Sequence, residues 1–254
     1  MNTLVRFERD QDVAVLTIDN PPVNALSPGV PEALTAAITQ ANADAPVRAI
    51  VVIGAGRTFI AGADVNEFQK PTAASYVASL RACLLTIEDS AKPVVMAIHG
   101  TALGGGLETA MAGHYRVITQ SAQVGQPEVK LGLIAGYGGS QRLVRLVGLG
   151  RALELLLVGE PISAQRAYEI GLVNGVYPQA ELIPQCEKWI QKMLGNGPVA
   201  LKLTLEAAHR GIQMTLEEGL NLEATLFGLI CTTEDMKEGT RAFLEKRTAQ
   251  FKNR

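Results

Sequence analysis

The sequence has few of the residues that build metal centres and disulfide frameworks. Among its 254 residues are only 3 cysteines and 3 histidines. The cysteines are Cys83, Cys186 and Cys231, and the histidines are His99, His114 and His209. An odd number of widely spaced cysteines matches neither a disulfide framework nor a zinc motif, so we expect reduced thiols. The histidines are scattered and share no ligand spacing with the cysteines, so no metal site is expected.

The chain also lacks a charge excess and a long hydrophobic run. Its 23 basic and 25 acidic residues give a net charge of −2, which offers no basic surface for nucleic acid or anionic lipid. No apolar run approaches the roughly 20 residues that span a bilayer. The first residues, with Arg6, Glu8, Arg9 and Asp10, do not resemble a signal peptide. We therefore expect a cytoplasmic protein without nucleic-acid or membrane partners.

What the chain does have is enough apolar content for a large core. Hydrophobic residues make up 47% of the sequence, which suffices for one domain, or for one domain with a small appendage. Up to residue 177 the pattern alternates between short apolar strands and amphipathic helices, and this alternation predicts an α/β fold. The expected strands are 4–8, 13–18, 49–53, 94–98, 115–119, a short one at 124, and 172–177. The expected helices are 31–43, 76–89, 137–147, 151–158 and 163–170, with Ser27 and Ser140 as N-caps.

From Pro178 onward the pattern contains helices only. The expected helices are 181–194, 198–209, 215–230 and 234–246. Each is amphipathic and carries too many apolar residues to stand alone, so this part should cover the core or a neighbouring subunit.

The stretch from Lys92 to Glu128 carries the most informative pattern. An apolar run at 94–98, typical of a buried strand, is followed by three glycines, 104–106, where a helix should begin. Each glycine costs about 1 kcal/mol relative to alanine inside a helix, so the run needs a reason. Without side chains, the free amides of the first helical turn and the positive end of the helix dipole can approach a bound oxygen.

Two carboxylates accompany these amides. Glu108 falls on the first turn of the expected helix, and Glu128 follows Pro127 at an expected bend. Carboxylates beside a row of backbone donors suit proton transfer next to a polarised carbonyl. These residues alone leave a structural role open, because acidic residues at helix starts commonly act as caps or partners of the dipole.

Several segments together make the chain resemble the crotonase, or enoyl-CoA hydratase/isomerase, superfamily. They occur in the order of the family and cover nearly the whole chain. These segments are 59–64, 102–108, 125–128, 136–142, 159–164 and 167–172. The resemblance implies a crotonase-like spiral of repeated ββα units with a helical C-terminal region. It implies a core of residues 1–195, and a helical region, 196–254, that completes the CoA site and forms a trimer.

The resemblance also implies a reaction. Crotonase relatives bind an acyl-CoA thioester and polarise its carbonyl with two backbone amides, here those of Ala63 and Gly105. In relatives that hydrate a C2=C3 double bond, two carboxylates hold the water; Glu108 would take its proton and Glu128 would deliver a proton to C2. Because both are present, we expect an enoyl-CoA hydratase. The alternatives are a Δ3-Δ2-enoyl-CoA isomerase or another enolate-forming lyase, and a non-catalytic member that binds acyl-CoA or RNA.

The resemblance constrains the CoA contacts only weakly. The residues it places near CoA or the acyl group are Ala61, Gly62, Asp64, Val65, Asn66, Tyr137, Phe227, Phe243 and Lys246. Asn66 stands where many relatives have lysine, and Tyr137 stands where several have a small residue, so its ring would shape the acyl pocket. Core packing is the alternative role of the two phenylalanines. No cofactor is expected beyond the CoA of the substrate, and the expected assembly is a homotrimer or a hexamer.

Overall fold

The computed structural model describes residues 4–253 and contains two compact units. Unit 1 comprises the chain up to Ser90 and Val94–Glu187, and unit 2 comprises Ala91–Pro93 and the chain from Lys188 onward. The boundary at 195/196 that the resemblance implies and the roles given to the C-terminal part remain predictions.

Unit 1 is built on a six-stranded sheet with the order β1-β2-β3-β4-β6-β9. Its strands are β1 (Val5–Asp10), β2 (Val13–Ile18), β3 (Ala49–Gly54), β4 (Val94–Ile98), β6 (Tyr115–Thr119) and β9 (Gly175–Tyr177). The first two form the expected antiparallel hairpin, and every other pair is parallel. All five residues of β4 are buried, as expected of a central parallel strand with apolar side chains on both faces.

β1 forms one edge of this sheet. It pairs with β2 along one side, and its exposed residues include Arg6, Glu8, Arg9 and Asp10. The edge strand therefore carries charged side chains, whereas its neighbour β2 buries Ala14, Leu16 and Ile18.

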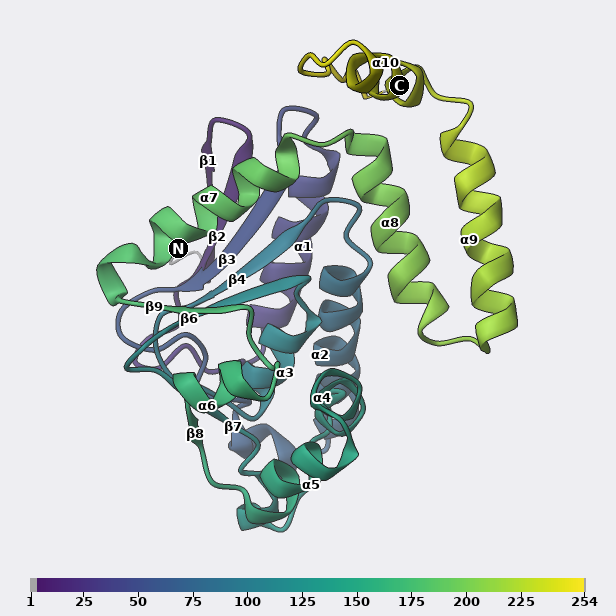
Figure 1. Cartoon of the computed structure of the whole chain (residues 1–254). Coiled ribbons are helices and arrows are strands. Elements are labelled where there is room, and N and C mark those ends of the chain that lie inside the picture. The colour runs from purple at the N-terminus through teal and green to yellow at the C-terminus, as the bar shows by residue number, and fades with distance from the viewer. Residues whose placement is uncertain (1–3, 254) are drawn as a thin grey trace. The chain divides into compact units, whose positions relative to one another are not determined.

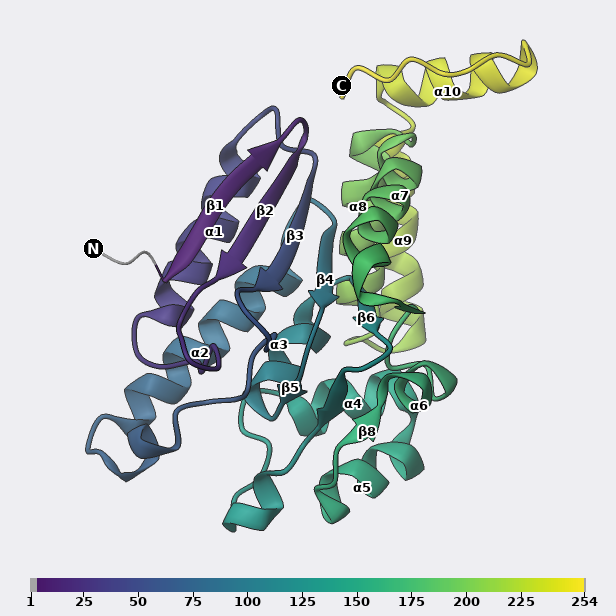
Figure 2. The same cartoon turned by 90° about the vertical axis from the view of Figure 1, so that its left-hand side faces the viewer.

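Helix α1 (Val30–Ala43) packs against β1 and β2, and helix α2 (Ala73–Glu88) packs against α1 (Figures 1 and 2). The prediction that Ser27 caps α1 is wrong. The N-cap is Gly29, whose positive φ of 95° favours glycine and whose N–H donates to the Glu32 carboxylate at 2.9 Å. Ser27 instead donates through its hydroxyl to Asp64 at 3.3 Å.

The rest of unit 1 consists mainly of short elements. They are α3 (Gly105–Ala112), α4 (Gly139–Val147), α5 (Leu149–Val158), α6 (Ala164–Glu169), the single-turn helices η1 (Val65–Gln69), η2 (Glu128–Leu131) and η3 (Gln179–Glu181), and a small sheet of β5 (Ala102–Leu103), β7 (Gln123–Gly125) and β8 (Ile162–Ser163). Of these, α4, α5 and α6 lie below the sheet in Figure 1. The sequence pattern missed η1, η2, η3, β5 and β8, because two to five residues give no measurable period.

Two expected elements of unit 1 begin at least two residues later than predicted. The last strand begins at Gly175 and not at 172, because the N–H groups of Leu172 and Val173 turn back to the carbonyl of Ala167 and close α6. Helix α4 begins at Gly139, and its N-cap is Gly138, with a φ of 102°. The prediction that Ser140 caps this helix is therefore wrong.

Unit 2 contains the end of α7 (Leu182–Leu194), then α8 (Pro198–Gly211), α9 (Leu216–Ile230) and α10 (Glu234–Leu244). α8 and α9 run side by side as a helical hairpin (Figure 1). Phe227 and Phe243 are 68% and 82% exposed, so their alternative role in core packing is wrong. Within the described residues, no helix is long and apolar enough to cross a membrane.

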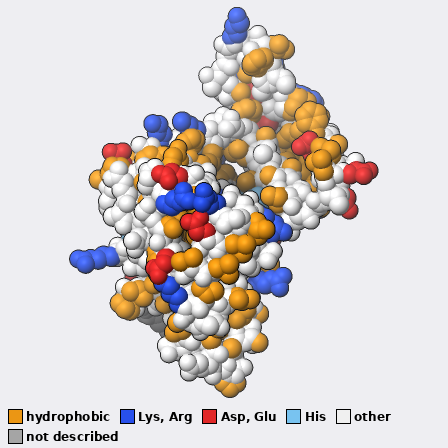
Figure 3. Space-filling view, turned by 60° about the horizontal axis from the view of Figure 1, so that its bottom comes forward, with side chains coloured by type: hydrophobic (Ala, Val, Ile, Leu, Met, Phe, Trp, Pro, Cys, Tyr) orange, Lys and Arg blue, Asp and Glu red, His pale blue; other side chains and the backbone are white. Residues whose placement is uncertain are grey.

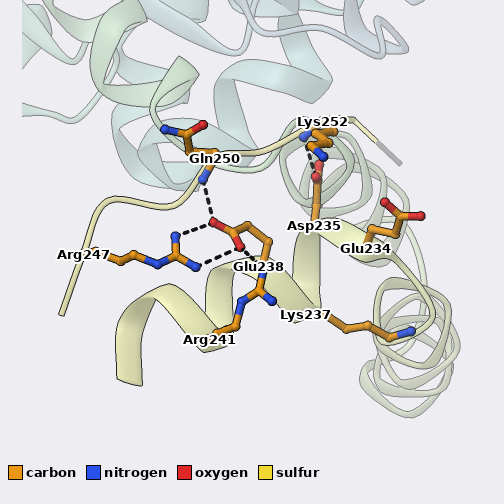
Figure 4. A pocket seen from close by; sticks show the side chains of 8 residues that line it. All are labelled: Glu234, Asp235, Lys237, Glu238, Arg241, Arg247, Gln250 and Lys252. Carbon is orange, nitrogen blue, oxygen red and sulfur yellow. Dashed lines mark hydrogen bonds and ion pairs between the residues drawn. The ribbon is translucent and has the colours of Figure 1, made fainter. Parts of the chain in front are cut away.

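The C-terminal tail folds back onto α10 (Figure 4). Glu238 accepts hydrogen bonds from Arg241 at 2.7 Å, from Arg247 at 2.6 Å and from the Gln250 N–H at 3.0 Å. The buried Asp235 carboxylate accepts the N–H of Lys252 at 2.6 Å. These residues line a polar cavity of about 570 Å³ whose charges largely pair with one another.

Candidate active site

A cavity of about 300 Å³ in unit 1 brings together most of the predicted site residues. Its walls come from the loop after β3, from β5, from the start of α3, and from the segment around η2. The predicted residues in these walls are Ala61, Gly62, Ala63, Val65, Gly105, Glu128 and Tyr137. The remaining lining is mostly apolar, from Phe68, Val77, Leu103, Leu131, Leu133 and Ile134, as a site for an acyl group requires.

Glu108, on the first turn of α3, does not itself line this cavity but is fully buried and contacts the lining residue Tyr137. Its Oε1 accepts the N–H of Tyr137 at 2.8 Å and the N–H of Gly139 at 2.7 Å. Its Oε2 is buried without a hydrogen-bond partner among the described residues. Burial raises the pKa of Glu108 to about 7; the two amides oppose this rise, and the charge of Glu128 adds to it.

Glu128 begins η2 and lines the cavity, half-buried. Burial raises the pKa of this carboxyl above its ordinary value. A Cβ added at Gly104 would lie 2.8 Å from Glu128 Oε1, so the carboxylate lies close against the glycine turn. Gly104 itself has a φ of 50°, which a residue with a side chain adopts only with strain.

The two residues expected to polarise the carbonyl through their N–H groups, Ala63 and Gly105, lie close together in the cavity lining. A Cβ built at Gly105 would lie 3.2 Å from the Ala63 nitrogen, which shows how closely the two backbones approach. Among the described residues, neither the Ala63 N–H nor the Gly105 N–H donates to a protein acceptor. Gly105 is the first residue of α3, where N–H groups have no partner within the helix. Both donors are therefore free to bind an oxygen that enters the cavity.

Close packing of the neighbouring backbone fixes the positions of the Ala63 and Gly105 N–H groups. A Cβ at Gly106 would lie only 2.0 Å from the carbonyl oxygen of Ile60, and the Leu26 N–H donates to the Gly62 carbonyl at 2.9 Å. The buried Asn24 side chain ties down the preceding loop by donating to the carbonyls of Ala55 at 2.9 Å and Thr58 at 2.7 Å.

Five predicted contacts lie outside the cavity lining. Asp64 caps η1 by accepting the N–H of Asn66 at 3.1 Å, and Asn66 is exposed beside it. Phe227, Phe243 and Lys246 belong to unit 2, where all three are exposed. Their contacts with CoA remain predictions. Among residues 4–253, no group of His, Cys, Asp and Glu side chains could hold a metal ion.

Sequence reasoning missed two polar residues of the site. Gln126 is buried, and with its amide nitrogen turned towards Glu128 it donates to both carboxylate oxygens, at 2.9 and 3.0 Å. Arg142 donates to the Tyr137 carbonyl at 2.9 Å and forms a two-point pair with Glu88, at 3.2 and 2.6 Å. Both lie inside the family motifs 125–128 and 136–142. The sequence gives no local signal for their hydrogen bonds, and the pair of Arg142 with Glu88 depends on segments that meet only in the fold.

Comparison with known proteins agrees with this geometry. Residues 8–254 match the family model for enoyl-CoA hydratase/isomerase. The chain is 46% identical over 248 residues to a probable enoyl-CoA hydratase of Bacillus subtilis, covering 96% of both chains. It is 41% identical over 250 residues to a crotonyl-CoA hydratase of Syntrophomonas wolfei, again covering 96% of both. It superposes on a crystal structure of an enoyl-CoA hydratase from Bacillus anthracis with a TM-score of 0.94 and 37% identity, covering 99% of this chain and 100% of the other.

The fold and the site thus define an α/β protein with a buried carboxylate beside a cavity lined by free amides. The chain belongs to the enoyl-CoA hydratase/isomerase family. The predicted resemblance and the predicted crotonase fold are confirmed.

Proposed function

We propose that this chain is an enoyl-CoA hydratase, a hydro-lyase that adds water across the C2=C3 double bond of a trans-2-enoyl-CoA to give a 3-hydroxyacyl-CoA. The observation that carries the proposal is a cavity lined by Glu128, Ala63 and Gly105, where the Ala63 and Gly105 N–H groups have no protein acceptor among the described residues. The buried Glu108 carboxyl, whose pKa the Glu128 charge helps to raise, binds the N–H of the lining residue Tyr137. The names of the relatives from B. subtilis and S. wolfei support the same activity.

The first step would be binding of the thioester carbonyl oxygen by the N–H groups of Ala63 and Gly105. These donors would stabilise the negative charge that develops on this oxygen when water attacks C3. In comparable oxyanion sites one such donor contributes about 3 to 4 kcal/mol. Both residues line the same cavity, and a Cβ added at Gly105 would lie 3.2 Å from the Ala63 nitrogen, which supports a joint role of the two donors.

Glu108 would act as the base towards water. Its Oε1 is held by two N–H groups, so its unpartnered Oε2 is the atom left to accept the proton. A pKa of about 7 means that the carboxyl can take up and release a proton near neutral pH, as a general base requires. Glu128, on the cavity wall, would deliver a proton to C2.

The isomerase is the main alternative within the family. Relatives that only shift a double bond commonly keep one acid, at the position of Glu128, whereas here Glu108 is present as well, with one carboxylate oxygen that has no partner among the described residues. The intact pair also disfavours a non-catalytic binding protein. We also propose that the reaction serves the breakdown of fatty acids or related acyl-CoA compounds. A cytoplasmic location and the lack of nucleic-acid partners stay predictions.

We further propose that the chain assembles into a homotrimer or a hexamer. Leu149, Leu153 and Leu157 form an exposed stripe at helical spacing along α5, and Figure 3, which brings this end of unit 1 forward, shows hydrophobic side chains beside charged ones. Apolar faces of this kind are commonly covered in closed symmetric oligomers. Light scattering at micromolar concentration tests the proposal, and a stable monomer of 27.0 kDa would refute it.

The experiment that tests the function compares the wild type with Glu128→Gln. Wild type should remove the absorbance of the conjugated thioester of crotonyl-CoA without added metal or nicotinamide. Glu128→Gln keeps the size and most hydrogen bonds but cannot supply the proton, so hydration should fall by roughly 10²- to 10⁴-fold. This corresponds to about 3 to 5 kcal/mol of barrier. Absence of turnover by the wild type, with CoA binding intact, would instead support the non-catalytic alternative.

A further inference from the structure

Tyr137 occupies an unusual place in the proposed acyl cavity. It is the most buried of the large side chains that line the cavity, at 5% exposure, whereas Leu131 and Ile134 on the same lining are 62% and 79% exposed. The cavity thus has an open rim of aliphatic side chains and an inner wall formed by an aromatic ring. The ring also lies beside the expected oxyanion site, because a Cβ at Gly105 would come within 3.4 Å of Tyr137 Cδ2.

The backbone of Tyr137 is held by hydrogen bonds on both sides. The ring can therefore leave the cavity wall only by rotating its buried side chain. Its N–H donates to Glu108 and its carbonyl accepts from Arg142, which is in turn held by the two-point pair with Glu88. Arg142 and Glu88 are both largely buried, where a two-point ion pair keeps its geometry well. This chain of contacts makes the inner wall a rigid element.

The hydroxyl of Tyr137 shows that this side chain is not explained by packing alone. It is buried and has no hydrogen-bond partner among the described residues. A buried donor without a partner costs about 1 to 3 kcal/mol of stability, so the fold gains nothing from this hydroxyl. Buried polar groups without a partner are rare in folded proteins, so the position of this hydroxyl has a reason other than packing.

We propose that Tyr137 is the specificity-determining residue of the acyl cavity and restricts the enzyme to short-chain enoyl-CoA thioesters. The inference rests on the proposed hydratase function. A volume of about 300 Å³ is at the small end of ligand pockets, which span about 300 to 1,000 Å³, and it must also take the thioester. A longer acyl chain would need the space that the ring fills.

The test measures kcat/KM for crotonyl-, hexenoyl-, octenoyl- and decenoyl-CoA. The wild type should lose activity steeply along this series. Tyr137→Ala removes the ring and should raise the ratio of decenoyl-CoA to crotonyl-CoA turnover by roughly tenfold or more, because a few methylene groups in an apolar pocket change kcat/KM by such factors. Tyr137→Phe is the matched control, since it keeps the ring and should keep the wild-type ratio.

The outcomes separate this inference from the proposed function. If the wild type hydrates none of the thioesters, the proposed function fails. If it hydrates crotonyl-CoA and decenoyl-CoA equally well, or if Tyr137→Ala leaves the ratio unchanged, the function stands and the inference about Tyr137 is overturned. Should Tyr137→Ala lose turnover altogether, calorimetric binding of butyryl-CoA and decanoyl-CoA to it gives the answer: a selective gain for decanoyl-CoA supports the inference, and equal affinity changes refute it.

Discussion

Glu108→Gln should make the protein more stable at alkaline pH while it abolishes hydration. The pKa of this carboxyl rises from an ordinary value of 4.5 to about 7 in the fold. The folded state therefore holds the proton more tightly than the unfolded state between these values, and stability falls as the pH rises through them. At about 1.36 kcal/mol per unit, the ionised carboxylate costs the fold about 3 kcal/mol above pH 7.

The glutamine side chain removes this dependence on pH. Its oxygen can still accept the N–H groups of Tyr137 and Gly139, while its NH₂ group takes the place of the unpartnered Oε2. A buried NH₂ without a partner costs about 1 to 3 kcal/mol, but this cost is the same at every pH. Relative to the wild type, the variant should therefore gain about 2 to 3 kcal/mol of unfolding free energy between pH 5 and pH 8.

The measurement is urea unfolding of both proteins at pH 5 and pH 8, at one protein concentration, followed by circular dichroism. It gives the change with pH in the difference between the unfolding free energies of the variant and the wild type. Titration of groups that do not interact with Glu108 cancels between the two proteins, whereas the interaction between Glu108 and Glu128 is part of the measured difference. If the difference between wild type and variant were the same at both pH values, Glu108 would titrate as an ordinary carboxyl. If the variant were far less stable at both, the carboxylate would be a structural cap, and its proposed role as a base would be wrong.

Two further predictions concern the same site. The kcat/KM for crotonyl-CoA should fall as the pH drops through about 7, because protonated Glu108 cannot accept a proton from water; a profile that is flat between about pH 6 and 8 would refute this. Gly106→Ala should lower the unfolding free energy by about 1 to 3 kcal/mol and weaken hydration, because its Cβ would meet the Ile60 carbonyl oxygen at 2.0 Å. Gly150→Ala on α5, where a Cβ meets nothing within 4 Å, is the control for the urea measurement and should unfold no earlier than the wild type.

Much of the fold was predictable from periodicity. The strands 13–18, 94–98 and 115–119 have the predicted bounds, because apolar runs of this length between turn residues leave little choice of structure. The caps at Ser27 and Ser140 were wrong because glycines at positive φ, Gly29 and Gly138, begin those helices instead. Serine is often found at N-caps, but the position of a helix start also depends on the backbone conformation. At these two helices that conformation is set by tertiary packing and cannot be read from the local sequence.

The site was predictable only in part. The glycine run and the neighbouring Glu108 could be identified from the sequence. Glycines lower the stability of a helix, so three of them at an expected helix start indicate a special role. Nothing local indicates that the Arg142 guanidinium would hold the Tyr137 carbonyl, or that the Tyr137 hydroxyl would be buried without a partner. Both depend on α4 lying beside α2 and α3, and such pairings between distant segments have no periodic signal.

The charged edge strand β1 has a consequence for handling the protein. An edge strand exposes unpaired N–H and C=O groups that can recruit a strand of another molecule, which is how sheets begin to aggregate. This edge carries four exposed charged side chains, those of Arg6, Glu8, Arg9 and Asp10. A second strand could pair there only if these charges lost their contact with water. Variants that replace these residues with valine or isoleucine would keep the hairpin pattern but lose this protection, so they should form fibrils or precipitate under conditions in which the parent chain stays dispersed.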